Sequence, residues 1–299
     1  EGLLDQEVHP TVITKGYKLA KEEALKILDK ISQKIGPEDT DKLTKIAVTA
    51  MTGKSSERAS NYLAHIAVSA IKTVTEKIDG KNVVDSDNVK IEKKEGGSIE
   101  DTELIRGIII DKEIVHSGMP KSLKNAKILL LDYALEMEKT ETDAQIQITT
   151  PEQLQSFMDQ EDKILKDMTE KISKSGCNVL FTQKGIDDMA QHYLAKKGIL
   201  AARRVKKSDM EKLARATGGK IAMSLNDISA SDLGFAGTVE EKKIAGEPMI
   251  FVRECKDPKA VSILLRGGTE HVVAEVERAM QDAVKGIASA LEVGKIVSG

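Results

Sequence analysis

The stretch VLFTQKGIDDMAQHYLAKKGILAARRVKKSDMEKLARAT, residues 179–217, decides the fold. It begins with a short apolar run at 179–181 and continues with a helical pattern over 186–196. A second strand-length segment, at 199–205 with the apolar run 199–201, precedes another helical pattern over 209–217. Strand-length runs that alternate with helical patterns are typical of βαβ units. The stretch therefore predicts an α/β layer in the middle of the chain.

Strands and helices are also expected on both sides of this stretch. Strand-length apolar runs occur at residues 108–110, 128–131, 249–252 and 263–265. Apolar residues recur every three or four positions over 13–35, 63–78 and 272–291, which predicts three long helices. Gly36-Pro37 and Asp79-Gly80 should end the first two, and Thr269 should cap the third.

These patterns predict a multidomain chain of mixed α/β and α+β class. Mainly helical segments at the two ends flank an inserted α/β domain of about 150 residues, a common domain size. The glycine pairs Gly96-Gly97 and Gly267-Gly268 are the expected hinges between the parts.

One more helix is expected after Thr150-Pro151, where proline suits the first helical position. Its stripe of apolar residues is interrupted by Glu161. Such a helix either docks on a core or projects to meet a partner, and the pattern alone favours docking. The stripe consists of Leu154, Phe157, Met158, Leu165, Met168 and Ile172.

The composition bounds the class of protein. Of the 299 residues, 40% are hydrophobic and 31% are charged, which is typical of a folded globular chain. The near-balance of 45 basic and 48 acidic residues, with 3% aromatics, argues against nucleic acid as a partner. No apolar run is long enough for a membrane span, and the first residues resemble neither a signal nor a transit peptide. The separated Cys177 and Cys255 and five scattered histidines favour a cytoplasmic protein without disulfides or a metal site.

Thr52-Gly53-Lys54-Ser55 is the nearest approach to a nucleotide-binding motif. A Gly-Lys-Ser at a helix start could hold a phosphate. A P-loop also needs a glycine five positions before Gly53, and that position is Val48. The alternatives are a glycine turn with a serine cap, or a small NTPase without its first glycine.

Asp282 lies on the polar side of the last predicted helix, with Arg278 and Lys285 as helical neighbours. Such a carboxylate either takes part in surface ion pairs or orients a water molecule for hydrolysis. The residues alone leave both possibilities open.

Several longer strings resemble group II chaperonins of the archaeal thermosome type. The resemblance covers essentially the whole chain, and its strings occur in the family's order. They are VHPTVITKGY at 8–17, MTGK at 51–54, GSIEDTELIRG at 97–107, QKGIDD at 183–188 and RRVKKSDMEKLA at 203–214.

The resemblance implies a domain map. Residues 1–40 correspond to an equatorial remnant, and residues 41–110 and 264–299 to the intermediate domain with the start of the second equatorial half. Residues 111–263 correspond to the apical domain, with a helical protrusion, or lid, at about 140–175. The family's Gly-Asp-Gly-Thr-Thr loop is missing, so we expect a subunit cut back to its intermediate and apical domains.

The resemblance also implies an ATP-dependent chaperonin that couples hydrolysis to chamber closure, with ATP and Mg²⁺ as cofactors of the full-length subunit. It implies that Asp282 orients the attacking water and that Thr52, Gly53 and Lys54 contact the nucleotide. Leu154, Phe157 and Met158 would lie at the lid tip. The expected client-contact residues are Leu165, Met168, Ile172, Met189 and Tyr193.

The implied partners are unfolded or partly folded proteins and the other subunits of a double ring. Without the main nucleotide loops, this chain alone should be a monomer and inactive as an ATPase. The alternative function is a stand-alone, ATP-independent module that holds unfolded proteins.

Overall fold

The computed structural model describes residues 2, 6–53, 59–137, 151–226 and 228–298, apart from the side chain of Leu154. Its helices are α2 (Pro10–Ile31), α3 (Thr40–Met51), α4 (Ser60–Val74), α5 (Pro151–Lys174), α6 (Asp188–Lys196), α7 (Lys207–Thr217) and α8 (Glu270–Val293). Its strands are β1 (Gln33–Lys34), β2 (Glu76–Ile78), β3 (Lys81–Val83), β4 (Val89–Glu95), β5 (Glu103–Ile105), β6 (Ile108–Ile110), β7 (Ser122–Leu131), β8 (Val179–Thr182), β9 (Leu200–Ala202), β10 (Ile221–Ala222), β11 (Gly234–Ile244), β12 (Glu247–Arg253), β13 (Val261–Gly267) and β14 (Lys295–Ile296).

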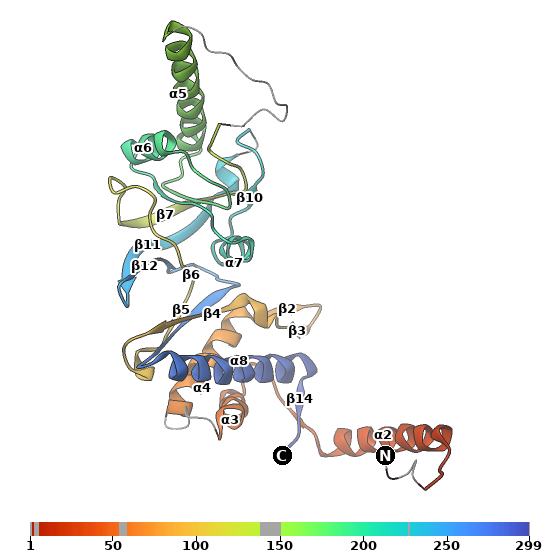
Figure 1. Ribbon diagram of the computed structural model, residues 1–299. Coiled ribbons are helices and arrows are strands. Elements are labelled where there is room, and N and C mark those ends of the chain that lie inside the picture. The colour runs from red at the N-terminus through yellow and green to blue at the C-terminus, as the bar shows by residue number, and fades with distance from the viewer. Residues whose placement is uncertain (1, 3–5, 54–58, 138–150, 227, 299) are drawn as a thin grey trace.

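The middle of the chain folds around a mixed sheet of seven described strands (Figure 1). Their order is β6-β12-β11-β7-β8-β9, and β10 also pairs with β7. Strands β7, β8, β9 and β10 are parallel and are connected through α5, α6 and α7. Strands β11 and β12 pair antiparallel beside them. The predicted α/β layer is therefore confirmed, and we call residues 108–253 the sheet unit.

Strand β7 is apolar in consecutive positions because both of its faces are covered. Ile128 and Leu130 belong to the cluster that includes Met210 of α7. Leu129 and Leu131 belong to the opposite cluster, which includes residues of α5 and α6. Successive side chains of a strand point to opposite faces, so a sheet between two helical layers needs an unbroken apolar run.

The two flanks of the sheet unit come together in space. The three-stranded sheet β4-β13-β5 packs against α4 and α8, and α3 packs on both helices. We call residues 40–105 and 261–293 the helix unit. The predicted strand at 263–265 is confirmed as a strand, but β13 belongs to this flanking sheet, not to the inserted layer. The flanks are therefore less purely helical than expected.

Two predicted helix ends were wrong. Helix α4 stops at Val74, and Glu76–Ile78 pairs with Lys81–Val83 in a hairpin. Asp79 and Gly80 both have positive φ angles, 51° and 78°, as a two-residue Asp-Gly hairpin turn requires. Helix α2 stops at Ile31 rather than at residue 35. The start of α8 is as predicted, since the Thr269 side chain accepts a hydrogen bond from the Val272 N–H.

Helix α2 extends away from the helix unit and buries none of its residues (Figure 1). The chain after it returns to the body through β1, which pairs antiparallel with β14. Many large apolar side chains of α2 are exposed: Val12, Tyr17, Leu19, Leu25, Ile27, Leu28 and Ile31.

The chain passes between the two units twice, at residues 106–107 and 254–260, and we call these segments the crossings. A small apolar cluster joins the sheets beside them: Ile105 and Leu264 from the helix unit, and Ile109, Met249 and Phe251 from the sheet unit. The expected boundaries at 110/111 and 263/264 fall at the end of β6 and inside β13. The structural boundary lies at the crossings instead, because strand pairing decides which unit a strand joins.

Candidate functional site

Asp282 lies in the middle of α8, on a part of the helix surface that is exposed. The opposite side of α8 is buried in the core of the helix unit, so the backbone that carries Asp282 is firmly held. Gly286, one turn later, faces Ile46 of α3: a Cβ added there would lie 3.6 Å from the Ile46 Cγ2. The carboxylate is thus presented to solvent from a rigid helix near α3, as a water-orienting group requires.

The second predicted nucleotide element follows α3. Thr52 ends that helix, and its hydroxyl donates to the carbonyl of Val48 at 2.9 Å. Gly53 has φ 78° and open space around an added Cβ. Lys54 and Ser55 lie outside the described residues. Because Val48 is inside α3, the position that a P-loop reserves for glycine is helical, which argues against a small NTPase built on this motif.

The expected hinge glycines do not lie where the units join. Gly96-Gly97 follows the end of β4, and Gly267-Gly268 follows the end of β13. Because β4 and β13 are parallel and in register, with Glu95 opposite Gly267, both pairs lie at the same end of the small sheet. The crossings leave from the other end. These glycine pairs are therefore not between the two units. The Arg266 guanidinium also donates a hydrogen bond to the Gly96 carbonyl, so the first pair is tied to the end of β13.

The first crossing contains a glycine that the sequence did not single out. Gly107 has φ 150°, and a Cβ added to it would lie 2.0 Å from the Val252 carbonyl oxygen and 3.3 Å from the Cys255 sulfur. The Cys255 N–H donates to the Arg106 carbonyl at 3.4 Å, which ties the two crossings together. Only glycine allows this close approach of the backbones. The string that ends in Gly107 was visible in the sequence, but its contact with Val252 was not.

The five expected client-contact residues divide into buried and accessible ones. Leu165 and Ile172 of α5 are 3% and 0% exposed, so no client can reach them in this structure. They face the sheet because the second half of α5 docks on it. Met168 is half-buried and lines a groove of about 220 Å³ with Ile164 and residues 224–226. Met189, in the first turn of α6, is 46% exposed.

Tyr193 connects α6 with α5. Its hydroxyl donates a hydrogen bond to the Asp162 carboxylate, which links α6 to the middle of α5. This hydrogen bond raises the pKa of the phenol. Tyr193 is half-buried, so part of its ring still faces solvent while its hydroxyl links the two helices.

Helix α5 both docks and projects. Its second half lies on the sheet unit, and its first half extends beyond the unit (Figure 1). In the projecting half, Met158 is 55% exposed and Phe157 is half-buried. The Leu154 side chain and residues 138–150, which include most of the expected approach to the lid, lie outside the described part.

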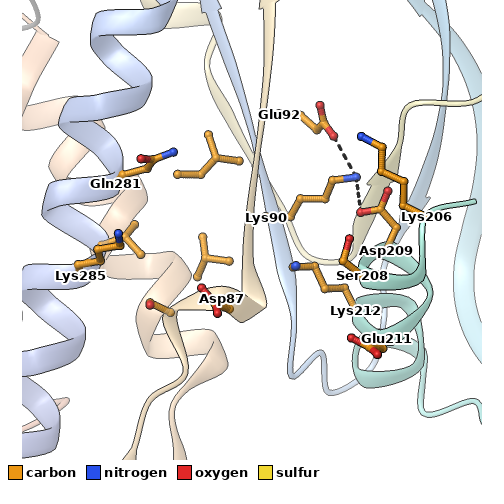
Figure 2. A pocket seen from close by; sticks show the side chains of 14 residues that line it. Asp87, Lys90, Glu92, Lys206, Ser208, Asp209, Glu211, Lys212, Gln281 and Lys285 are labelled. Carbon is orange, nitrogen blue, oxygen red and sulfur yellow. Dashed lines mark ion pairs between the residues drawn. The ribbon is translucent and has the colours of Figure 1, made fainter.

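A cleft of about 580 Å³ opens between the two units (Figure 2). Strand β4 and α8 line one side, and the first turns of α7 line the other. Its walls carry charges of both signs, and Lys90 of β4 extends toward Asp209 of α7. Nothing in the sequence patterns pointed to this cleft, because its residues come from three separate segments.

Both cysteines are buried and unpaired. Burial raises the pKa of the Cys177 thiol and raises the pKa of Cys255 to about 12. The thiolate is the reactive form, so we expect the folded chain to react with Ellman's reagent at least about 100-fold more slowly than the urea-unfolded chain. A native thiol that reacts at the unfolded rate would show that the burial of that cysteine is wrong.

Within the described residues, no group of three or more His, Cys, Asp or Glu side chains is arranged to hold a metal ion. None of the described helices combines the length and the apolarity that crossing a membrane requires.

The sequence pattern of the TCP-1/cpn60 chaperonin family matches residues 1–299. A thermosome subunit of Pyrococcus horikoshii is 61% identical over 299 residues, which are all of this chain and 54% of that protein. A thermosome subunit of Methanopyrus kandleri is 60% identical over the same length, or 55% of that protein. The chain thus spans about half the length of these curated relatives.

A solved structure shares the fold. The open-state monomer of a group II chaperonin from Methanococcoides burtonii matches all of this chain and 68% of its own, with a TM-score of 0.76 and 42% identity. The chain therefore belongs to the TCP-1/cpn60 chaperonin family, and its expected place among group II chaperonins of the thermosome type is confirmed.

Proposed function

We propose that this chain is the client-binding and lid-bearing part of an ATP-dependent group II chaperonin subunit that assists protein folding. The observation that carries the proposal is the surface of the sheet unit, where Met189 and Ile164 are 46% and 40% exposed on adjacent helices. Flexible apolar side chains can repack against varied partners, as binding of many unfolded proteins requires. Helix α5 projects beside them as the proposed lid.

In this proposal the sheet unit is the apical domain and the helix unit is the intermediate domain. Helix α2 belongs to the equatorial domain, and its exposed apolar side chains would be covered there in a full-length subunit. Two free cysteines suit a reducing cytosol, where we place the protein.

The nucleotide chemistry is proposed for the full-length subunit only. ATP with Mg²⁺ would supply the phosphate that is cleaved, Asp282 would orient the attacking water, and the Thr52–Gly53 turn would lead a lysine toward the terminal phosphate. The described residues fit this limited role: an exposed carboxylate on a rigid helix, and a turn that glycine keeps open. We place no adenine pocket on them, and we propose that this chain alone does not hydrolyse ATP.

A second candidate is an ATP-independent module that holds unfolded proteins. The exposed Met189 of α6 supports this candidate as well as it supports the ATP-dependent subunit, because a surface that holds unfolded proteins needs no nucleotide. The two candidates differ in whether ATP changes the binding of a client in the longer protein.

Binding of a urea-unfolded, fluorescently labelled client tests the holding surface. We expect Met189→Lys to weaken the apparent affinity of this chain at least about fivefold, since a charge would replace a central apolar contact. Ile78→Lys is the matched control: Ile78 is 51% exposed but lies on the hairpin of the helix unit, and affinity should stay within about twofold.

The exposed apolar face of α2 is the competing explanation for any binding. Unchanged affinity in Met189→Lys, with loss of binding in Leu25→Lys, would contradict the proposed client surface. Both variants should keep the wild-type circular dichroism spectrum, since both side chains are exposed.

A further inference from the structure

Lys90 holds an unusual position for a charged residue. It lies on β4, and its side chain is only 10% exposed. Its ammonium contacts the Glu92 carboxylate at 2.9 Å, the Asp209 carboxylate at 2.8 Å and the Ile109 carbonyl oxygen at 2.8 Å. An ammonium group has three N–H donors, so all three have a partner here.

These partners come from both units. Glu92 is on the same strand as Lys90, whereas Asp209 is on α7 and Ile109 is on β6 of the sheet unit. Figure 2 shows Lys90 between the two carboxylates, on the edge of the cleft that separates β4 from α7. The contact is therefore a bridge beside open space, since the units are not packed against each other along the cleft.

Other ion pairs also connect the units, but each has at least one partner far more exposed than Lys90 or Asp209. Lys94 of β4, for example, binds Asp111 and Glu247, which are 52% and 65% exposed. Glu76 of β2 binds Arg215 at 2.6 Å and Lys259 at 2.7 Å, and those two side chains are 44% and 49% exposed. The hydrogen bond from Lys259 lowers the pKa of Glu76. Exposed pairs exchange readily with water and contribute little. By contrast, the Asp209 side chain is 10% exposed, like that of Lys90, and a buried charge that loses its partner is strongly destabilised.

Both members of the Lys90–Asp209 pair have a second means of stabilisation. If the units moved apart, Lys90 would keep Glu92, which is two residues away on the same strand face. Asp209 is the third residue of α7, where the positive end of the helix dipole stabilises a carboxylate. Neither charge would be left without a favourable interaction, so the bridge can open and close. A pair without such substitutes would be a permanent link.

We propose that Lys90 and Asp209 form an ionic latch that fixes the orientation of the sheet unit on the helix unit. Opening the latch lets the sheet unit rotate about the crossings and the small apolar cluster at Ile109 and Leu264, and it changes the width of the cleft. In this proposal the latch is closed as in the structure, with Lys90 on Asp209, or open, with Lys90 on Glu92 alone, and a hinged domain motion needs two such arrangements. This inference concerns the chain itself and does not depend on the proposed chaperone activity.

Distance measurements between two spin labels test the latch in this chain. Labels at Lys197→Cys on the sheet unit and Ser289→Cys on α8 use exposed positions, and the native cysteines are buried. We expect one narrow distance distribution for the labelled parent. Asp209→Asn should at least about double its width or add a second population, because the released unit samples both orientations.

Two control variants separate the latch from a general effect of charge. Glu211→Gln removes an exposed carboxylate from the same helix, and it should leave the distribution unchanged. Glu92→Gln should also keep the narrow distribution, because Asp209 remains to hold Lys90. If Asp209→Asn fails to fold, the distance distribution is measured on Lys90→Met instead. A folded Asp209→Asn or Lys90→Met variant with the parent's distribution would overturn the proposal.

Discussion

Asp282→Ala in a full-length subunit is expected to reduce kcat for ATP hydrolysis by at least about 100-fold, because a lost general base or water-orienting group costs about 10²–10⁴. ATP affinity should stay within about twofold. The carboxylate is exposed on the rigid α8, so it can reach a water molecule without being needed for the fold. Single-turnover hydrolysis and equilibrium binding of ATP measure the two effects separately.

Glu292→Gln is the matched control for that variant, since Glu292 is an exposed carboxylate on the same helix, ten residues further on. Its hydrolysis rate should be that of the parent. If Asp282→Ala retained normal turnover, the surface ion-pair interpretation of Asp282 would hold and the catalytic assignment would be withdrawn.

Gly107→Ala is expected to destabilise the chain by about 3 kcal/mol or more. The added Cβ would lie 2.0 Å from the Val252 carbonyl oxygen, which is far inside van der Waals contact. The obstacle is backbone, so it cannot rotate away as a flexible side chain would. Urea unfolding followed by circular dichroism and by reactivity of Cys255 would report the loss.

Gly176→Ala separates this close contact from the cost of an unfavourable φ angle. Gly176, in the sheet unit, has φ 81°, and nothing lies within 4 Å of an added Cβ. Its cost should be about 1 kcal/mol, the usual penalty of a left-handed conformation for a residue with a side chain. If both variants lost the same stability, the tight approach at the first crossing would be wrong.

The sequence predicted those features that depend on local patterns. The apolar runs of β7, β8 and β12 predicted strands because both faces of the sheet are covered, and Thr269 marked the start of α8 because an N-cap is a local interaction. The end of α4 was missed because Ile78 continues its apolar spacing four residues after Val74, whereas the Asp-Gly turn after Ile78 selects a hairpin.

Features that depend on distant contacts were not predictable in this way. Gly96-Gly97 looks like a hinge in sequence, but the parallel pairing of β4 with β13 places it away from the crossings. Lys90 looks like an ordinary surface lysine of a strand, because its partner Asp209 is 119 positions away in the chain. Leu165 and Met168 are in one apolar stripe, yet only packing on the sheet decides which is accessible.

The functional residues needed the family resemblance in addition to the patterns. Asp282 has the same local surroundings as many surface carboxylates, and Thr52–Gly53 resembles an ordinary helix end. The structure supplies compatible geometry for both residues: an exposed carboxylate on α8 and an open turn after α3.

The most direct test of the proposed function is the suppression of aggregation of a chemically denatured client by this 299-residue chain, with and without ATP. We predict protection that is the same in both conditions, because the holding surface lies on the sheet unit and the main nucleotide loops are not in this sequence. A chain that gave no protection would contradict the client-binding proposal. Protection that changed with ATP would contradict our assignment of the nucleotide site to the full-length subunit.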